Sequence, residues 1–133
     1  MKEQLALITT YFSLVDAFET APTAYAAVLH PDVIQTEFPN LLYKSIQHRS
    51  FTEILDNLRI GRELLQDSRF DVSSTQPCAD GSVVVEGVWQ ATVISDVGPF
   101  TRGQRLSAQL SLIFEFKDGQ IFRQRRYPCY EPF

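Results

Sequence analysis

The stretch Gln104–Lys117, QRLSAQLSLIFEFK, decides the fold of this chain. Successive side chains of a β-strand point to opposite faces, so residues two apart share a face. The even-numbered positions from 106 to 116 are all apolar, whereas the odd-numbered positions are polar except for Ile113. This alternation predicts a long strand with one dry face and one mostly polar face.

Three further strands surround it. The run Ser82–Asp96 alternates in the same way, and Gly87 stands in its apolar line as an expected bulge position. Asp80-Gly81 and Asp118-Gly119 are strong signals for tight hairpins. Strands are therefore expected at residues 69–76, 82–96, 104–117 and 120–130. Together they form an antiparallel meander, and strands of this length must twist and coil.

The N-terminal half contains the helices that cover this sheet. Residues 3–19 have apolar side chains over about half of a helical circumference, which suggests a helix pressed into a concave surface. A short helix is expected to run to about Leu29, followed by a strand at Val33–Phe38 and a loop over residues 41–49. The third helix runs to about Gln66. It starts at Ser50, because Ser50 and Glu53 have capping-box spacing.

These elements predict a single domain over residues 1–133 of the α+β class. We expect a cone-shaped half-barrel of curved antiparallel sheet, with the three N-terminal helices packed in its concave face. Such a cone often leaves a pocket between the sheet and the helices, which is the default place for a small ligand.

Composition narrows the possible functions. The chain has 133 residues and a net charge of −4, which argues against nucleic-acid binding because that requires a basic surface. No run approaches the length of a membrane span, and the N-terminus has no signal peptide. Two cysteines make neither a disulfide framework nor a metal motif, so a reduced cytoplasmic protein is expected. No metal, flavin, nicotinamide or nucleotide motif is present, and we expect no cofactor.

In its order of elements and in several motifs, the chain resembles the superfamily of nuclear transport factor 2, ketosteroid isomerase and the SnoaL-like polyketide cyclases. The motifs are Tyr11–Ala17 (YFSLVDA), Leu29–Asp32 (LHPD), Gly87–Trp89 (GVW) and the closing segment Asp118–Phe133. The resemblance covers the whole chain and is greatest to SnoaL-like proteins of unknown activity. It implies the same half-barrel fold, which carries enzymes, ligand binders and association domains alike.

The resemblance to ketosteroid isomerases also suggests site residues. Tyr11 matches the first-helix tyrosine that donates a hydrogen bond to the developing enolate. The isomerase base precedes a proline, where this chain has Phe38, whereas counting forward from Asp32 places Glu37 there if the strand is shifted or bulged. The second acidic donor corresponds to about Leu112. Steroid isomerisation is therefore not expected.

The residues themselves leave alternatives open. Glu37 is either a general base whose pKa is raised by desolvation at the mouth of an apolar pocket, or an exposed strand residue. Tyr11 is either an oxyanion donor or a core tyrosine. Trp89 is either a pocket wall or purely structural. If Tyr127 reaches the pocket, Arg125 becomes a buried cation that could pair with Glu37.

Two functions follow. The first is a small-molecule-binding protein that could act on an apolar carbonyl compound as a cofactor-free isomerase, cyclase or dehydratase, with Glu37 as base. The second is a ligand-binding or association module without catalysis. In both, the expected partners are a small apolar molecule and a second copy of the chain, since the outer face of a half-barrel can form a homodimer. The residues expected to line the pocket are Tyr11, Phe38, Trp89, Leu112, Phe114 and Tyr127.

Overall fold

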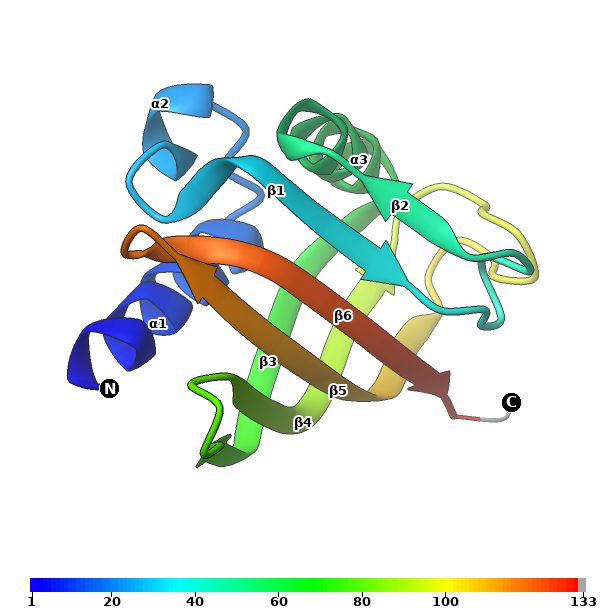
Figure 1. Ribbon diagram of the computed structural model, residues 1–133. Coiled ribbons are helices and arrows are strands. Elements are labelled where there is room, and N and C mark those ends of the chain that lie inside the picture. The colour runs from blue at the N-terminus through cyan, green and yellow to red at the C-terminus, as the bar shows by residue number, and fades with distance from the viewer. Residues whose placement is uncertain (132–133) are drawn as a thin grey trace.

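The computed structural model describes residues 1–131. Pro132 and Phe133, the end of the closing motif, lie outside the described residues. In the described residues the helices all lie in the first half of the chain, and the second half is built of strands (Figure 1). The elements in chain order are α1 (Lys2–Asp16), α2 (Pro22–Tyr25), β1 (Leu29–Glu37), β2 (Gln47–Arg49), α3 (Phe51–Leu64), β3 (Leu65–Pro77), β4 (Val83–Val93), β5 (Arg105–Lys117) and β6 (Gln120–Tyr130).

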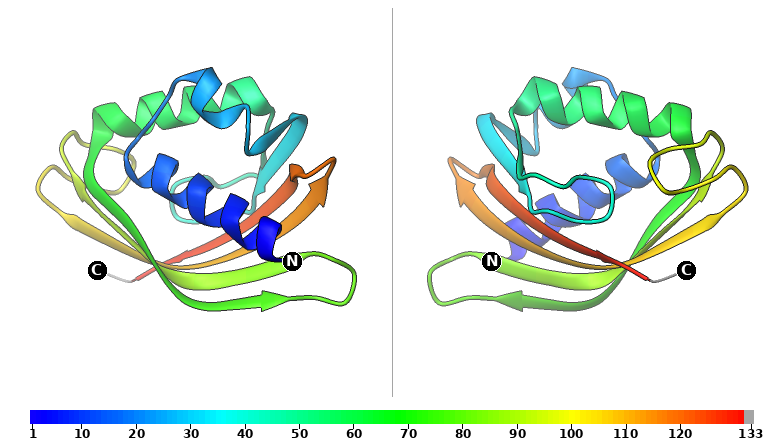
Figure 2. Two further views of the ribbon diagram at one scale, coloured as in Figure 1. Left: turned by 90° about the vertical axis from the view of Figure 1, so that its left-hand side faces the viewer. Right: turned by 90° about the vertical axis from the view of Figure 1, so that its right-hand side faces the viewer.

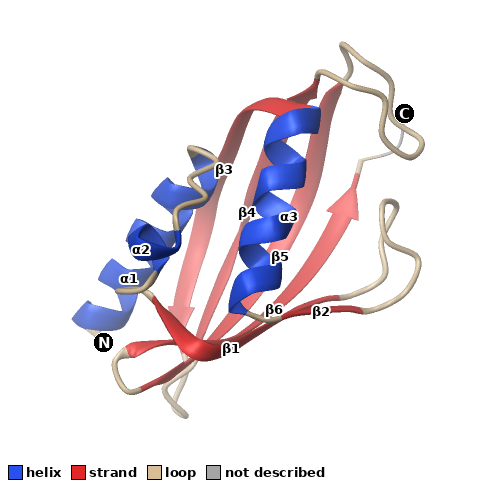
Figure 3. Cartoon of the chain, turned by 90° about the horizontal axis from the view of Figure 1, so that it is seen from above, coloured by secondary structure: helices blue, strands red, loops and turns tan. Residues whose placement is uncertain are grey.

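The six strands form one curved sheet in the order β2-β1-β6-β5-β4-β3. The meander from β3 to β6 is antiparallel throughout, as the alternating runs predict. In the sheet as a whole, β1 pairs with β6 in parallel, so the first strand of the chain lies beside the last. The sheet curves beneath the helices (Figure 2), and from above α1 and α3 lie side by side over its concave face (Figure 3). The predicted α+β half-barrel with helices in its concave face is confirmed.

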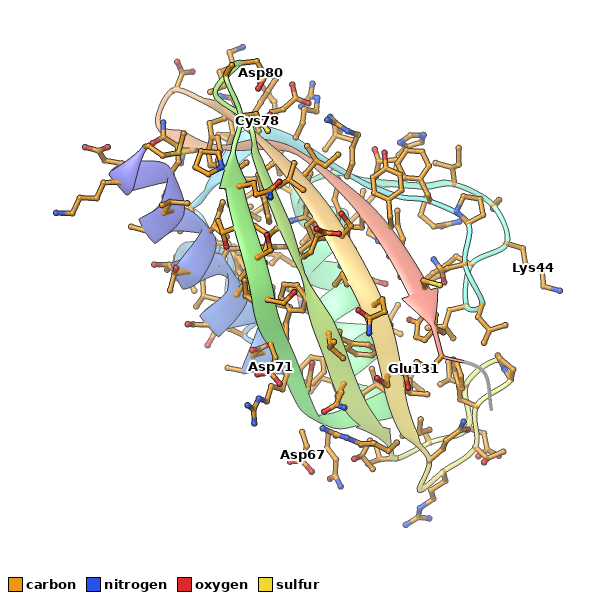
Figure 4. The ribbon with its side chains drawn as sticks, turned by 90° about the horizontal axis from the view of Figure 1, so that it is seen from below. Lys44, Asp67, Asp71, Cys78, Asp80 and Glu131 are labelled. Carbon is orange, nitrogen blue, oxygen red and sulfur yellow. The ribbon has the colours of Figure 1, made fainter. Side chains whose placement is uncertain are left out.

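The alternation in β5 separates the core from the outer face. Leu106, Ala108, Leu110, Leu112 and Phe114 are each at most 6% exposed. Viewed from below, the outer face of the sheet carries polar side chains in the open, with Asp67 and Cys78 marking the two ends of β3 (Figure 4). One dry face and one wet face therefore follow directly from the sequence of this strand.

Gly87 lies beside a bulge, although the extra residue belongs to the neighbouring strand. The register of β3 against β4 shifts between Val72 and Ser74, opposite Gly87. A Cβ atom on Gly87 would lie 2.2 Å from the carbonyl oxygen of Asp71. Glycine is needed here because the bulged backbone approaches too closely for any side chain.

Several boundaries differ from those expected. The chain leaves the second helix early and enters β1 at Leu29, because Leu29 pairs with Ile121 of β6 and sheet hydrogen bonding replaces helical bonding. Part of the expected loop is the three-residue edge strand β2, whose periodicity is too short to read from sequence.

The start of α3 is as predicted. The hydroxyl oxygen of Ser50 accepts a hydrogen bond from the Glu53 amide at 3.3 Å, and the Glu53 carboxylate accepts one from the Ser50 amide at 3.0 Å. This capping box fixes where the helix begins over the sheet. In residues 1–131, no helix is long and apolar enough to cross a membrane.

Candidate functional site

A cavity of about 220 Å³ lies between α3, the concave face of β4–β6 and the two loops at residues 38–46 and 94–104. Most of its lining is apolar, and this part includes Leu58 and Leu64 of α3 and Leu106 and Leu110 of β5. The rest of the lining is Val15, Phe18, Glu37, Leu42, Tyr43, Asn57, Ile60, Gly61, Leu65, Ser68, Trp89, Val97, Gly98, Ala108, Arg126, Pro128 and Tyr130.

Glu37 and Arg126 place charge in this mostly apolar lining. They are register partners in the parallel pair of β1 and β6, so their side chains leave the sheet on the same face. Glu37 is only 5% exposed. Its inward direction follows from the alternation of β1, because Gln35 and Val33 on the same parity are also buried. The alternative of an exposed strand residue is therefore wrong.

Arg49 of β2 holds Glu37 from the sheet edge. The Arg49 guanidinium donates to Glu37 Oε1 and to Gln35 Oε1, both at 2.9 Å. Asn40 Nδ2 donates to Glu37 Oε2 at 2.9 Å, so each carboxylate oxygen has a partner. We call Glu37, Arg49 and Arg126 the charged corner.

A polar chain connects the charged corner to α1. The amide nitrogen of Gln35 donates to the Gln124 side-chain oxygen at 2.8 Å and to the Tyr11 hydroxyl at 3.2 Å. Gln35 and Gln124 are each 2% exposed and Tyr11 is 3% exposed. Buried polar groups need such partners, so this chain fixes the orientation of the groups behind the cavity.

Electrostatics keep Glu37 ionised. Burial alone would raise its pKa, but the charges of Arg126 and Arg49 and the hydrogen bonds from Arg49 and Asn40 outweigh burial and hold the pKa below its ordinary value. Tyr130, also in the lining, has its pKa raised by burial and by the charge of Glu37, so its hydroxyl stays protonated. The charged corner therefore contains an ionised carboxylate, and the lining beside it contains the neutral phenol of Tyr130.

Arg126 differs from Arg49 because its charge has no direct protein partner. Its Nε atom is buried without a hydrogen-bond partner. Across residues 1–131, its guanidinium also forms no hydrogen bond and no ion pair within 4.0 Å. A buried donor without a partner is costly, so this group is available to whatever enters the cavity.

Trp89 forms part of the wall, as expected of a pocket residue. Its indole nitrogen donates to the Ser68 hydroxyl at 2.9 Å, which fixes the ring plane. Its ring also meets Tyr130 edge-on, with 6.3 Å between centroids. A large aromatic face held in this way offers an apolar ligand a rigid contact surface.

The other residues expected in the pocket lie elsewhere. Tyr11, Leu112 and Phe114 belong to the core under α1, and Phe114 packs edge-on against Tyr11 at 6.2 Å between centroids. Phe38 stacks on Tyr127 at 4.5 Å between centroids, and Tyr127 is 41% exposed. The expected set and the observed lining thus share Trp89 and Glu37.

Arg125 does not pair with Glu37. It forms an ion pair with Glu115 of β5, and both side chains are more than one third exposed. A bulge explains this difference, because the register of β6 against β5 shifts between Glu115 and Phe116. Beyond it the even-numbered residues of β6 face inward, which places Arg126 rather than Arg125 at the cavity.

Arg49 and Arg126 are the groups that the sequence alone does not reveal. The sequence pattern places Arg49 in a loop, and uninterrupted alternation places Arg126 on the outer face. The signal that could have found them is the buried carboxylate itself, since a buried charge requires a cation nearby. Within the described residues, no three His, Cys, Asp or Glu side chains are arranged to hold a metal ion.

No protein-family model and no curated protein matches the chain. Solved structures do. A provisional SnoaL-like polyketide cyclase from Jannaschia sp. CCS1 is 13% identical, with 96% of this chain and 85% of that chain covered and a TM-score of 0.76. An NTF2-like protein of unknown function from Burkholderia pseudomallei is 15% identical, with 95% and 90% covered and a TM-score of 0.72.

A third structure extends the comparison to the isomerases. A Catenulispora acidiphila protein with a ketosteroid isomerase-like fold, in complex with trimethylamine, is 10% identical, with 91% of this chain and 83% of that chain covered and a TM-score of 0.69. At these identities the match concerns the fold. The chain therefore has the fold of the superfamily of SnoaL-like, ketosteroid isomerase-like and nuclear transport factor 2-like proteins.

Proposed function

We propose that this protein binds a small, mostly apolar molecule in the cavity between α3 and the sheet. The observation that carries the proposal is the combination of an apolar wall with one charged corner inside a single cavity. Ligand sites are typically built in this way, with apolar walls for affinity and a few polar groups for orientation. The Catenulispora protein of the same fold was solved with trimethylamine, which supports small-molecule binding within this architecture.

The size of the cavity limits the ligand. An apolar cavity of about 150 Å³ accepts benzene, and this one measures about 220 Å³. Sites for drug-sized molecules start at about 300 Å³. The cavity therefore suits a compact molecule of one or two rings.

Isothermal titration calorimetry with 2-tetralone, a neutral two-ring ketone, tests the proposal. We expect saturable binding to the unmodified protein and its loss in Ala108→Leu, because Ala108 lines the cavity and a larger side chain there occupies it. Val72→Leu enlarges a side chain that is 46% exposed and should bind normally. Equal binding by the unmodified protein and Ala108→Leu would place the ligand elsewhere and contradict the proposal.

A second candidate is proton-transfer catalysis in the same cavity, with Glu37 as the base. The position of Glu37 in the lining favours it. The lowered pKa of Glu37 opposes it, because an effective general base has a pKa near the working pH. Tyr11 cannot act beside Glu37 in this arrangement, since Gln35 and Arg49 stand between them.

Proton transfer can be tested without knowing the substrate. In D₂O, a base in the cavity exchanges the protons next to the carbonyl of 2-tetralone for deuterium, and proton NMR follows their disappearance. Catalysis predicts exchange faster than in buffer, and its loss in Glu37→Gln. Exchange at the buffer rate with 2-tetralone bound would leave binding as the function and exclude Glu37 as a base for this ketone.

A further inference from the structure

The charged corner does not balance its own charge. Glu37 contributes one negative charge, whereas Arg49 and Arg126 contribute two positive charges, which leaves one positive charge in excess. Both arginines act on Glu37, and in residues 1–131 no other charged group is among the causes of its lowered pKa. Partly buried charge without compensation is unfavourable, so one further negative charge would balance the corner.

The two arginines are not equally available. Arg49 is 6% exposed, and its guanidinium already bonds Glu37 and Gln35 while lying 5.2 Å from the Tyr43 ring centroid. Arg126 lies in the cavity lining with its Nε buried and unpartnered, and its guanidinium forms no hydrogen bond to any residue that the structure describes. Arg126 is therefore the arginine whose positive charge can bind a group inside the cavity.

We infer that the ligand is a compact apolar molecule with one carboxylate group, and that Arg126 holds this carboxylate. The inference rests on the proposed function and names its substrate class. A guanidinium presents its donors in a planar fork that matches the two oxygens of a carboxylate. One excess positive charge suits a monoanion, whereas a doubly charged phosphate would leave the corner negative.

The remaining lining agrees with this class of ligand. Tyr130, whose hydroxyl stays protonated, and Trp89 both lie in the lining with Arg126. Trp89 offers an aromatic face, and its indole N–H is already used by Ser68. The ring of an aromatic acid can thus rest on the apolar wall while its carboxylate reaches the corner.

The test compares two molecules that differ in one terminal group, a charged carboxylate or a neutral amide. Cinnamate and cinnamamide share one skeleton, and isothermal titration calorimetry gives the dissociation constant of each. We expect cinnamate to bind the unmodified protein about tenfold more tightly or better, as a charge-assisted hydrogen bond warrants. Arg126→Gln should remove this preference and leave cinnamamide binding within about a factor of two.

Arg125→Gln is the matched control. Arg125 is the preceding residue of β6, but it pairs with Glu115 on the outer face, so its loss changes the net charge equally without touching the cavity. This variant should keep the preference for cinnamate. Circular dichroism and thermal midpoints establish that both variants are folded.

Each outcome has one meaning. Cinnamamide binding as tightly as cinnamate, or a preference that survives in Arg126→Gln, overturns the inference and leaves the proposed function standing. Failure of both molecules and of 2-tetralone to bind at millimolar concentration overturns the inference and the proposed function together. A preference lost equally in Arg125→Gln would show that net charge, rather than the corner, is responsible, and also overturns the inference.

Discussion

At the scale of single residues, the buried ion pair between Arg49 and Glu37 gives the most direct test by mutation. Its side chains are 7% and 6% exposed, and removing one partner of such a pair typically costs about 3–5 kcal/mol of stability. Replacing Arg49 and replacing Glu37 should not lower the free energy of unfolding by the same amount. Arg49→Met leaves Glu37 with the charge of Arg126 nearby, whereas Glu37→Gln leaves two arginines and no carboxylate.

We therefore predict that Glu37→Gln lowers the free energy of unfolding more than Arg49→Met does. Urea denaturation of both variants at neutral pH measures the difference. A larger loss in Arg49→Met would mean that the hydrogen bond from Arg49 to Gln35 matters more than the charge balance of the corner.

The pH dependence of stability gives a second residue-scale prediction. The pKa of Glu37 in the folded chain lies below its ordinary value of 4.5. A lowered pKa stabilises the fold above that ordinary value, and the stabilisation is lost as the pH falls through the folded value. The gap in unfolding free energy between the unmodified protein and Glu37→Gln should therefore narrow below pH 4.5. A gap that stays constant down to about pH 2.5 would contradict the lowered pKa.

Residue by residue, the sequence predicts the cavity only in part. Trp89 is found by alternation in a long strand, and Glu37 by counting forward from Asp32 in the resemblance to the isomerases. Arg49 and Arg126 are missed because their directions depend on an edge strand and a bulge. Tyr11 resembles an isomerase tyrosine in sequence, yet its hydroxyl accepts a hydrogen bond from Gln35 behind the cavity and does not line it.

At the scale of elements, the bulge opposite Gly87 sets how the β3–β4 ribbon bends. A Cβ there would lie 2.2 Å from Asp71 O and 2.9 Å from Phe70 Cε1. We predict that Gly87→Ala costs about 1–3 kcal/mol or more, in line with forced overpacking. Thermal unfolding measures this loss.

Gly81→Ala separates this steric effect from backbone strain. Gly81 has a φ of +90°, and a Cβ added to it would meet no atom within 4 Å, so only conformational strain of about 1–2 kcal/mol applies. If Gly87→Ala destabilises the protein less than Gly81→Ala, the close approach at the bulge is not what makes glycine necessary.

Elements with a periodic or chemical signature are predictable from the sequence and the others are not. Alternation predicts the two faces of the long strands β4 and β5, and the spacing of Ser50 and Glu53 predicts the start of α3. Edge strand β2 spans three residues and has no period to detect. The parallel pairing of β1 with β6 joins segments about ninety residues apart, and no local pattern encodes it.

At the scale of the whole molecule, homodimerisation stays a prediction. The outer face of the sheet presents Gln109, Ser111 and Ile113 of β5. Sedimentation velocity at micromolar concentration should give twice the mass of the 15.2 kDa chain. A single monomeric species over that range would contradict the prediction.

The central claim, that a small molecule enters the cavity, has a built-in reporter. Trp89 is the one tryptophan of the chain, and its indole N–H lies in the cavity lining beside Ser68. The indole resonance in a ¹H–¹⁵N correlation spectrum is therefore a single signal that needs no further assignment. We would titrate 2-tetralone and cinnamate while following it. Binding in the cavity predicts a saturable shift of this resonance that is absent in Ala108→Leu. An indole resonance that does not move at millimolar ligand would contradict the claim.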